Sequence, residues 1–210
     1  MKIWDVENNF YLNTDVTRIN KLLCQFELFK KTIKVPGDIV ECGVFKGASF
    51  VRLLTYRNLL IQNKKKVIGF DAFGKFPKQS IKEDQKFAVS HDRDSGLGVS
   101  VAKFKKILKR KRFKRFELIK GDIKNTIPIY LNKNKNLKIS FLHLDMDVFE
   151  PTKIALNYLF QKVSKNGIIL IDDYNNVRGA TKATNYFLKN RRGLKIQKLK
   201  FNKRLSYLVK

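Results

Sequence analysis

The sequence predicts an α/β fold: a mostly parallel sheet of seven strands, with helices on both faces and an antiparallel hairpin at its C-terminal end. Apolar segments of strand length alternate with segments of helical periodicity, and this alternation is typical of a parallel sheet. The later strand-like segments are almost wholly apolar, as strands covered on both faces are. Two short alternating segments close the chain and predict the hairpin.

The predicted elements follow one another in a regular order. An amphipathic helix over residues 15–33 comes first, and a proline and a glycine at positions 36 and 37 end it. Strands are then expected at 38–43, 66–71, 116–122, 138–145 and 167–172, helices at 47–62, 99–111, 152–163 and 180–189, and the hairpin strands at 194–201 and 204–209. Residues 72–98 are long and polar, which predicts a lid or substrate loop. We expect a helical arm over residues 1–36 and one domain over residues 37–210.

The chain is strongly basic, with a formal net charge of +27 over 210 residues. Such a charge attracts nucleic acid, anionic membranes or phosphorylated substrates. The lysines, however, are spread along the whole chain beside many asparagines and isoleucines. We therefore interpret the charge as compositional bias on a solvated surface, with a polyanion site as the alternative.

No apolar run reaches the roughly 18 residues that predict a membrane span. The first residues also lack the apolar run of a signal peptide. The two cysteines, Cys24 and Cys42, are interpreted as reduced thiols of the core. A cytoplasmic protein with no membrane partner is expected.

The first predicted strand ends in a glycine turn, in which Gly43 and Gly47 follow Glu41. Glycines let a ligand approach the backbone closely and meet the N-terminus of the next helix. The spacing departs from the G-x-G-x-x-G pattern of dinucleotide-binding turns. Pyrophosphate binding, and with it a nicotinamide-dependent dehydrogenase, is therefore disfavoured.

Acidic residues end the second and third predicted strands, at Asp71 and Asp122. Ligands of an open parallel sheet bind beyond the carboxyl ends of its strands. A carboxylate at position 71 can accept hydrogen bonds from two ribose hydroxyls, and one at position 122 can reach an adenine amino group. The two strand ends together indicate an adenosine site.

Four further aspartates end the fourth and fifth predicted strands: Asp145, Asp147, Asp172 and Asp173. Neighbouring strands bring them to one rim, where they repel one another unless a cation neutralises them. Oxygen ligands alone favour Mg²⁺, Mn²⁺ or Ca²⁺ over zinc. The cluster therefore predicts a metal site, the alternative being helix capping and ion pairs with lysines. His143, on the apolar strand before the cluster, is interpreted as a core histidine.

Five segments match the pattern of one known family: residues 37–47, 70–77, 121–128, 144–152 and 167–174. The L-D-x-D-x-(aromatic)-E-x-T run at 144–152 and the D-D-Y run at 172–174 are specific, whereas the glycine motif is generic. On these residues the chain resembles the macrocin O-methyltransferase family, metal-dependent enzymes that methylate sugars. The resemblance covers about residues 37–190, and the terminal hairpin also fits it.

The resemblance implies a Rossmann-like class I methyltransferase fold, S-adenosylmethionine as methyl donor, and Mg²⁺ or Mn²⁺ as the metal. It implies a metal held by Asp147, Asp172 and Asp173, although the choice between Asp145 and Asp147 as ligand or as base stays open. The donor contacts that it implies are Glu41, Gly43, Gly47, Ser49, Asp71, Ala72, Phe73, Asp122 and Asp145.

Three departures from the family pattern concern the acceptor more than the donor. Ala72 stands where the family usually has serine, and Val148 and Phe149 follow Asp147 in place of leucine and tyrosine. Residues 78–98, which should shape the acceptor pocket, give no clear match. The acceptor therefore stays unidentified.

We predict donor- and metal-dependent methylation of a hydroxyl of a small molecule, such as a sugar or a glycosylated metabolite. Asp147, Asp145, or His91 from the lid would take the hydroxyl proton. Rival predictions are an RNA or other polyanionic acceptor, and a non-catalytic nucleic-acid-binding protein. No known nucleic-acid module is recognisable, which disfavours an RNA acceptor. The intact acidic strand ends disfavour a non-catalytic protein. The N-terminal helix packs either on its own domain or on another copy, so a homo-oligomer stays open.

Overall fold

The computed structural model describes residues 2–189, 191–202 and 204–210. Its helices are α1 (Ile3–Asn13), α2 (Val16–Lys30), α3 (Ala48–Ile61), α4 (Lys82–Ser95), α5 (Val101–Arg110), α6 (Ile123–Lys133), α7 (Phe149–Leu159) and α8 (Arg178–Leu188), with a short 3₁₀ helix η1 (Phe160–Lys162). Its strands are β1 (Asp38–Cys42), β2 (Val67–Asp71), β3 (Phe116–Lys120), β4 (Ile139–Leu144), β5 (Val163–Ile171) and β6 (Ser206–Val209).

The strands form one sheet in the order β3-β2-β1-β4-β5-β6. The first five strands are parallel, and β6 runs antiparallel to β5. Because the strand order reverses between β1 and β4, the carboxyl ends of these strands open the crevice where such sheets bind ligands. The predicted α/β fold with a mostly parallel sheet is confirmed.

The sheet has six strands, so the prediction of seven is wrong by one. Within the described part of residues 194–201, a single antiparallel bridge joins Gln197 to Tyr207 of β6. The amide of Asn202 donates to the carbonyl of Leu199 at 2.9 Å, so the chain turns before a second pair forms. The alternating pattern is present in the sequence, but the early turn leaves only one residue in register with β6.

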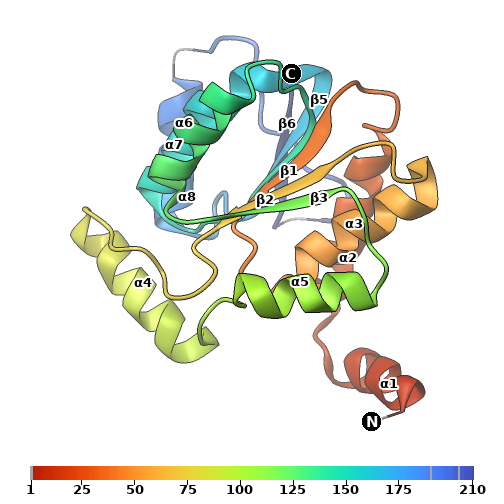
Figure 1. Ribbon diagram of the computed structural model, residues 1–210. Coiled ribbons are helices and arrows are strands. Elements are labelled where there is room, and N and C mark those ends of the chain that lie inside the picture. Colours follow the sequence, from red (N-terminus) through yellow and green to blue (C-terminus); the bar gives the residue numbers. More distant parts are fainter. Residues whose placement is uncertain (1, 190, 203) are drawn as a thin grey trace.

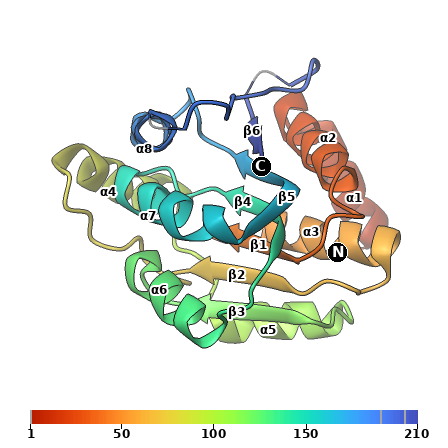
Figure 2. The same ribbon diagram turned by 90° about the horizontal axis from the view of Figure 1, so that it is seen from above.

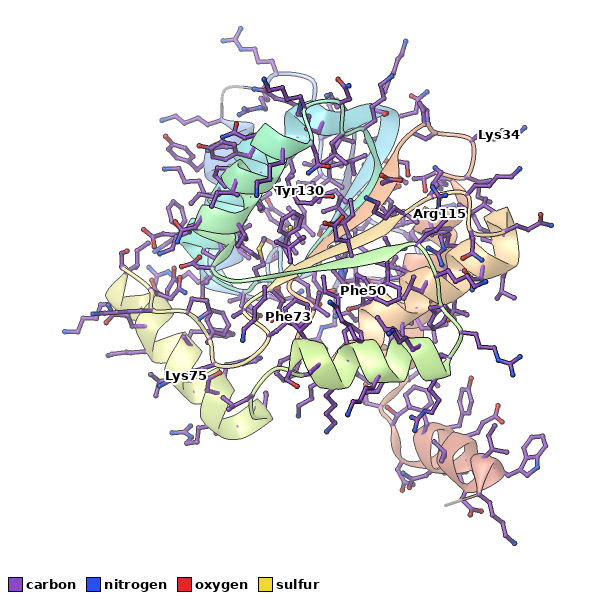
Figure 3. All side chains as sticks on the ribbon, in the orientation of Figure 1. Lys34, Phe50, Phe73, Lys75, Arg115 and Tyr130 are labelled. Carbon is purple, nitrogen blue, oxygen red and sulfur yellow. The ribbon has the colours of Figure 1, made fainter. Side chains whose placement is uncertain are left out.

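Helices cover both faces of the sheet, as predicted (Figures 1 and 2). Helices α2, α3 and α5 share one buried cluster with Ile39 of β1. Helices α6, α7 and α8 share the opposite cluster with Val40, the next residue of that strand. Successive side chains of a strand point to opposite faces, so each buried strand serves both layers. Figure 3 shows Phe50 and Phe73 on the α5 side of the sheet and Tyr130 on the other side.

Three helices, α1, α4 and α6, lie outside the predicted elements. Helix α4 lies inside the segment predicted as a loop, and its acidic first turn, Glu83 and Asp84, suits a helix N-terminus. Helix α6 carries Pro128 in its interior, where a missing N–H normally disfavours a helix. Burial of three of its apolar or aromatic side chains on the sheet stabilises it nonetheless.

Helix α1 has no buried residue and projects away from the sheet (Figure 1). Helix α2, in contrast, belongs to the core: Cys24, Leu28 and Phe29 are each at most 1% exposed. Cys24 and Cys42 are both buried free thiols, as predicted. Separate behaviour of residues 1–36 and 37–210 stays a prediction. Among the described residues, no helix has both the length and the apolarity needed to cross a membrane.

Candidate active site

One cavity of about 600 Å³ opens at the carboxyl ends of the parallel strands. The segments after β1, β2, β3, β4 and β5 contribute to its wall, together with α2, α4 and the first turn of α3. The sheet thus brings the predicted adenosine and metal sites to one space. The predicted site residues that line the cavity are Gly43, Ser49, Asp71, Ala72, His91, Asp122, Asp145, Asp147, Asp172 and Asp173.

Three predicted donor contacts are absent from the described cavity wall: Glu41, Gly47 and Phe73. Glu41 is fully buried, and Phe73 is 3% exposed within the core. Gly47 begins α3 with a φ of +89°, and a Cβ there would lie 2.4 Å from the ring of Phe104. In this structure Gly47 therefore shapes the turn after β1, Glu41 pairs with His143 of β4, and Phe73 packs in the core just after β2.

Asp71 organises the loops around the candidate adenosine site. One carboxylate oxygen accepts hydrogen bonds from the amides of Val44 at 2.8 Å and Phe45 at 2.9 Å. The other oxygen accepts from the amide of Phe73. A carboxylate has about four lone-pair directions, so one remains for a ligand hydroxyl. The side chain therefore both ties the β1 and β2 turns together and faces the cavity.

Asp122 combines a helix cap with a place on the cavity wall. One of its carboxylate oxygens accepts from the amide of Lys124 at 2.9 Å and caps α6. The other oxygen lies 3.6 Å from the ammonium of Lys124 in a half-exposed ion pair. Asp122 therefore caps a helix and pairs with a lysine, and its place on the cavity wall still leaves it open to a ligand.

The four aspartates of the predicted metal site meet at the ends of β4 and β5 and all line the cavity. The amide of Asp172 donates to the carbonyl of Leu144 at 3.0 Å, which holds the two strand ends together. Asp147 has a φ of +64°, a conformation fixed by the hydrogen bond from the amide of Ala180 to its carbonyl at 2.9 Å. One carboxylate oxygen each of Asp172 and Asp173 is buried with no hydrogen-bond partner among the described residues.

Burial and mutual repulsion dominate the electrostatics of this cluster. Burial is the main cause that raises the pKa of Asp145, Asp147 and Asp173, and the neighbouring carboxylates raise these pKa values further. The pKa of Asp172 is lowered, because His143 and Lys21 outweigh its burial. Three carboxyl groups thus resist ionisation until more positive charge reaches the site.

His143 links the glycine turn to the aspartates through a buried pair. Its Nδ1 lies 2.8 Å from Glu41, and its Nε2 lies 4.0 Å from Asp172. Burial alone would lower the pKa of His143, but Asp172 and Glu41 raise it to about 10. His143, Asp145 and Asp172 each offer a ligand atom within 4.8 Å of the others. A protonated imidazole has no free lone pair, however, so the carboxylates are the better metal ligands.

Lys21 of α2 is the main site residue that sequence reasoning misses. Its ammonium lies 2.6 Å from Asp172 and 3.2 Å from Asp145. Helical spacing puts it on the buried face of α2 with Cys24, Gln25 and Leu28, and this spacing was the available signal. In a chain with 45 lysines and arginines, one lysine on a helix does not stand out.

His91 belongs to a cluster of aromatic rings beside the glycine turn after β1. Its ring centroid lies 5.0 Å from that of Phe45 and 5.6 Å from that of Phe76, and it stacks on Phe87 at 6.0 Å. Its Nδ1 is buried without a partner among the described residues. Residues of the predicted lid therefore pack over the cavity as an aromatic cluster.

Comparison with known proteins identifies one family. A family model described as Macrocin-O-methyltransferase (TylF) matches residues 15–202. A demethyldecarbamoylnovobiocin O-methyltransferase of Streptomyces niveus is 29% identical over 150 residues, which cover 67% of this chain and 53% of that protein. An 8-demethyl-8-(2,3-dimethoxy-alpha-L-rhamnosyl)-tetracenomycin-C 4'-O-methyltransferase of Streptomyces olivaceus is 27% identical, with 67% and 54% covered. The chain spans about half the length of these curated relatives.

Two solved structures share the fold. The O-methyltransferase NovP superposes with a TM-score of 0.78 at 23% identity, covering 91% of this chain and 80% of that one. CalS11, a calicheamicin methyltransferase, superposes with a TM-score of 0.73 at 21% identity, covering 100% of this chain and 86% of that one. At these identities the likeness shows that the Rossmann-like methyltransferase architecture is shared.

Proposed function

The chain belongs to the macrocin O-methyltransferase family, and from this premise we propose that it transfers the methyl group of S-adenosylmethionine to a sugar hydroxyl, aided by a divalent cation. One observation carries the proposal: a single cavity joins the Asp71 end of β2 to the aspartates after β4 and β5. A methyl donor and a hydroxyl acceptor need such a shared space, because the transfer takes place between them.

The donor side of the cavity lies between the turns after β1, β2 and β3. Asp71 would accept from one ribose hydroxyl through its remaining lone-pair direction, and Asp122 would accept from the adenine amino group. Gly43 has a φ of +91°, and a Cβ there would lie 1.7 Å from the carbonyl oxygen of Asp145. The turn therefore needs glycine to run close beside the β4 end, which leaves the donor sulfonium near the aspartates. Ser49, Ala72 and the first turn of α3 complete this side.

Three features of the chain suit a Mg²⁺ or Mn²⁺ ion among the aspartates. The donors are carboxylate oxygens. Two of these oxygens are buried without a hydrogen-bond partner among the described residues. The ammonium of Lys21 already places a positive charge against Asp145 and Asp172. We assign the ion to Asp145, Asp172 and Asp173 in place of the expected Asp147, because Asp145 and Asp172 offer ligand atoms within 4.8 Å of one another. Asp173 adds a buried carboxylate oxygen that has no hydrogen-bond partner among the described residues. When bound, such a cation would lower the pKa of the acceptor hydroxyl.

Asp147 would then take the hydroxyl proton. Asp147 lines the cavity together with Asp145. Its backbone carbonyl accepts a hydrogen bond from the amide of Ala180. The hydroxyl oxygen attacks the methyl carbon in line with the carbon–sulfur bond, which breaks and leaves S-adenosylhomocysteine. The rings around His91 would exclude water from this reaction. His91 itself is the alternative base.

The acceptor is proposed as a sugar on the strength of the relatives. The names of the two curated relatives specify a novobiocin precursor and a rhamnosyl group of tetracenomycin C as their substrates. One structure of CalS11 is described as a TDP-rhamnose 3'-O-methyltransferase. Free, nucleotide-linked and glycoside-bound 6-deoxysugars are therefore the first acceptors to test.

The test measures S-adenosylhomocysteine formed from the donor and a panel of these sugars. Mg²⁺ should support turnover and EDTA should abolish it. Asp172→Ala should abolish turnover while the donor still binds in calorimetry, whereas Asp94→Asn, an exposed aspartate of α4, should behave as wild type. Full turnover in EDTA would exclude the metal, and absence of donor binding to the wild-type protein would exclude the function itself.

A further inference from the structure

Lys21 is set into the acidic cluster by the fold. Its side chain is 18% exposed and pairs with Asp172 at 2.6 Å and with Asp145 at 3.2 Å. Of the lysines and arginines that the structure describes, it is the one with an ion pair to the four aspartates at the ends of β4 and β5. It therefore supplies the nearest mobile positive charge to these carboxylates.

Helix α2 holds the backbone of Lys21 in place. The side chain of Asp15 caps the helix at its start through the amide of Thr17. One turn after Lys21, Cys24 and Gln25 are buried. The hydroxyl of Tyr56, from α3, donates to the carbonyl of Leu22 at 3.0 Å. The position of the ammonium thus follows from the packing of α2 on α3, while its own side chain stays free to change rotamer.

The pairing offsets a cost that the aspartates create. Buried like charges destabilise a fold unless each has a partner, and the cluster holds four carboxylates. Lys21 contributes one positive charge by two short contacts. A divalent cation contributes two charges and suits carboxylate oxygens better than an ammonium does. The ammonium of Lys21 and the divalent cation cannot bind the same oxygens of Asp145 and Asp172 at the same time.

We propose that Lys21 is a tethered counter-cation that competes with the divalent ion for Asp145 and Asp172. The inference rests on the proposed metal site. Binding of the ion releases Lys21 from the carboxylates and turns its ammonium toward the open cavity. In the absence of the ion, Lys21 keeps the cluster neutral enough for α2 to pack.

Mn²⁺ binding measures the competition directly, with free Mn²⁺ followed by its electron paramagnetic resonance signal. Lys21→Met keeps the apolar stem and removes the charge, so the variant should bind Mn²⁺ about tenfold or more tightly than wild type. Lys30→Met, on the same helix and paired with Glu27 at 2.8 Å, is the matched control and should bind as wild type. Equal or weaker binding by Lys21→Met would overturn the competition.

A second measurement uses the wild-type chain and so does not depend on the folding of a variant. An amine-acetylating reagent, followed by mass spectrometry, should label Lys21 slowly without metal and several-fold faster with saturating Mn²⁺, while Lys30 is unchanged. An unchanged rate at Lys21 while Mn²⁺ binds would overturn the inference and leave the metal site standing. If Mn²⁺ bound neither to wild type nor to Lys21→Met, both the proposed metal site and the competition by Lys21 would be overturned.

Discussion

At the scale of single residues, Asp71 illustrates how one carboxylate can serve both fold and site. Its two oxygens accept from three backbone amides of the turns after β1 and β2. It also lines the cavity where the donor ribose is proposed. A residue with both tasks is expected to affect stability and affinity together.

Asp71→Asn should therefore lower both the unfolding free energy and the affinity for S-adenosylmethionine. An amide offers only one acceptor oxygen, so at least one backbone N–H would face an NH₂ group. Loss of charge-assisted hydrogen bonds costs about 1.5–3 kcal/mol, and we expect at least about a tenfold weaker donor affinity. Urea unfolding and calorimetry measure the two effects. Asp94→Asn is the control, and unchanged values for Asp71→Asn would contradict the dual role.

Lys65 lies outside the candidate active site, and its environment predicts a pH dependence of the unfolding free energy. Its ammonium donates to the carbonyl of Thr32 at 2.8 Å and to that of Val35. Burial lowers its pKa from 10.5 to about 8, although Asp38 opposes the change. Between these values the unfolded chain binds more protons than the folded one, so the contribution of Lys65 to stability rises as the pH rises from 8 to 10.5. A neutral amine still has two N–H donors for the two carbonyls.

The stability of wild type relative to Lys65→Met should therefore increase from pH 7 to pH 10, as read from urea midpoints of both proteins. Lys64→Met, at the exposed neighbouring position, should keep a constant difference from wild type. A difference between wild type and Lys65→Met that is the same at both pH values would show that the Lys65 ammonium is not destabilised in the fold.

The acidic side of the candidate site could be predicted from the sequence because each aspartate ends a recognisable strand. Topology alone then brings Asp71, Asp145 and Asp172 to one rim. The placements of Lys21 and Glu41 depend on tertiary packing. Lys21 enters through the docking of α2, and Glu41 turns toward His143 at 2.8 Å instead of the cavity. Local spacing places Lys21 on the buried face of α2 but does not show which side chains it meets there, and it gives no direction for Glu41.

At the scale of elements, the glycine turn before α3 depends on one close contact. Gly47 has a φ of +89°, and an added Cβ would lie 2.4 Å from a ring atom of Phe104 in α5. Gly47→Ala should therefore lower the unfolding free energy by about 1–3 kcal/mol through overpacking and strain. Urea unfolding measures this loss. At Gly74 a Cβ would meet nothing within 4 Å, so Gly74→Ala should lie within about 0.5 kcal/mol of wild type. Equal stabilities of Gly47→Ala and wild type would show that Phe104 moves away from the added methyl group without loss of stability.

Strands β1, β2, β4 and β5 were predictable because buried parallel strands are short apolar runs. Helices were harder wherever tertiary contacts outweigh local preference. Pro128 argues against α6 in the sequence, yet Ile127 and Tyr130 bury its face on the sheet. The polar sequence of α4 resembles a loop, although Asp84 accepts from the amide of Phe149 at 2.9 Å and anchors it to α7.

At the scale of the whole molecule, the excess positive charge lies away from the cavity. The net charge is +27, with 45 lysines and arginines against 18 acids. Seven of those acids line the one cavity at the strand ends: Asp71, Asp92, Asp122, Asp145, Asp147, Asp172 and Asp173. Six of the 45 basic residues line the same cavity: Arg18, Lys21, Lys46, Arg52, Lys75 and Arg204. Acids and bases therefore nearly balance in its wall, and the excess positive charge lies elsewhere on the chain. The aspartates of the wall suit a cation, whereas polyanions are attracted to the remaining lysines.

A sugar acceptor and an RNA acceptor differ in where they would meet this charge. Surface lysines should bind RNA through its phosphates, and such binding falls steeply with salt, by about 10³-fold between 50 and 200 mM for six phosphate contacts. If RNA binds only the lysines outside the cavity, saturating RNA at low salt should leave the donor affinity in calorimetry unchanged. At about 0.15 M salt, no radiolabelled methyl group should pass from the donor to RNA. Label in RNA at that salt, in amounts that Asp172→Ala abolishes, would instead make RNA the acceptor and give the positive surface a catalytic purpose.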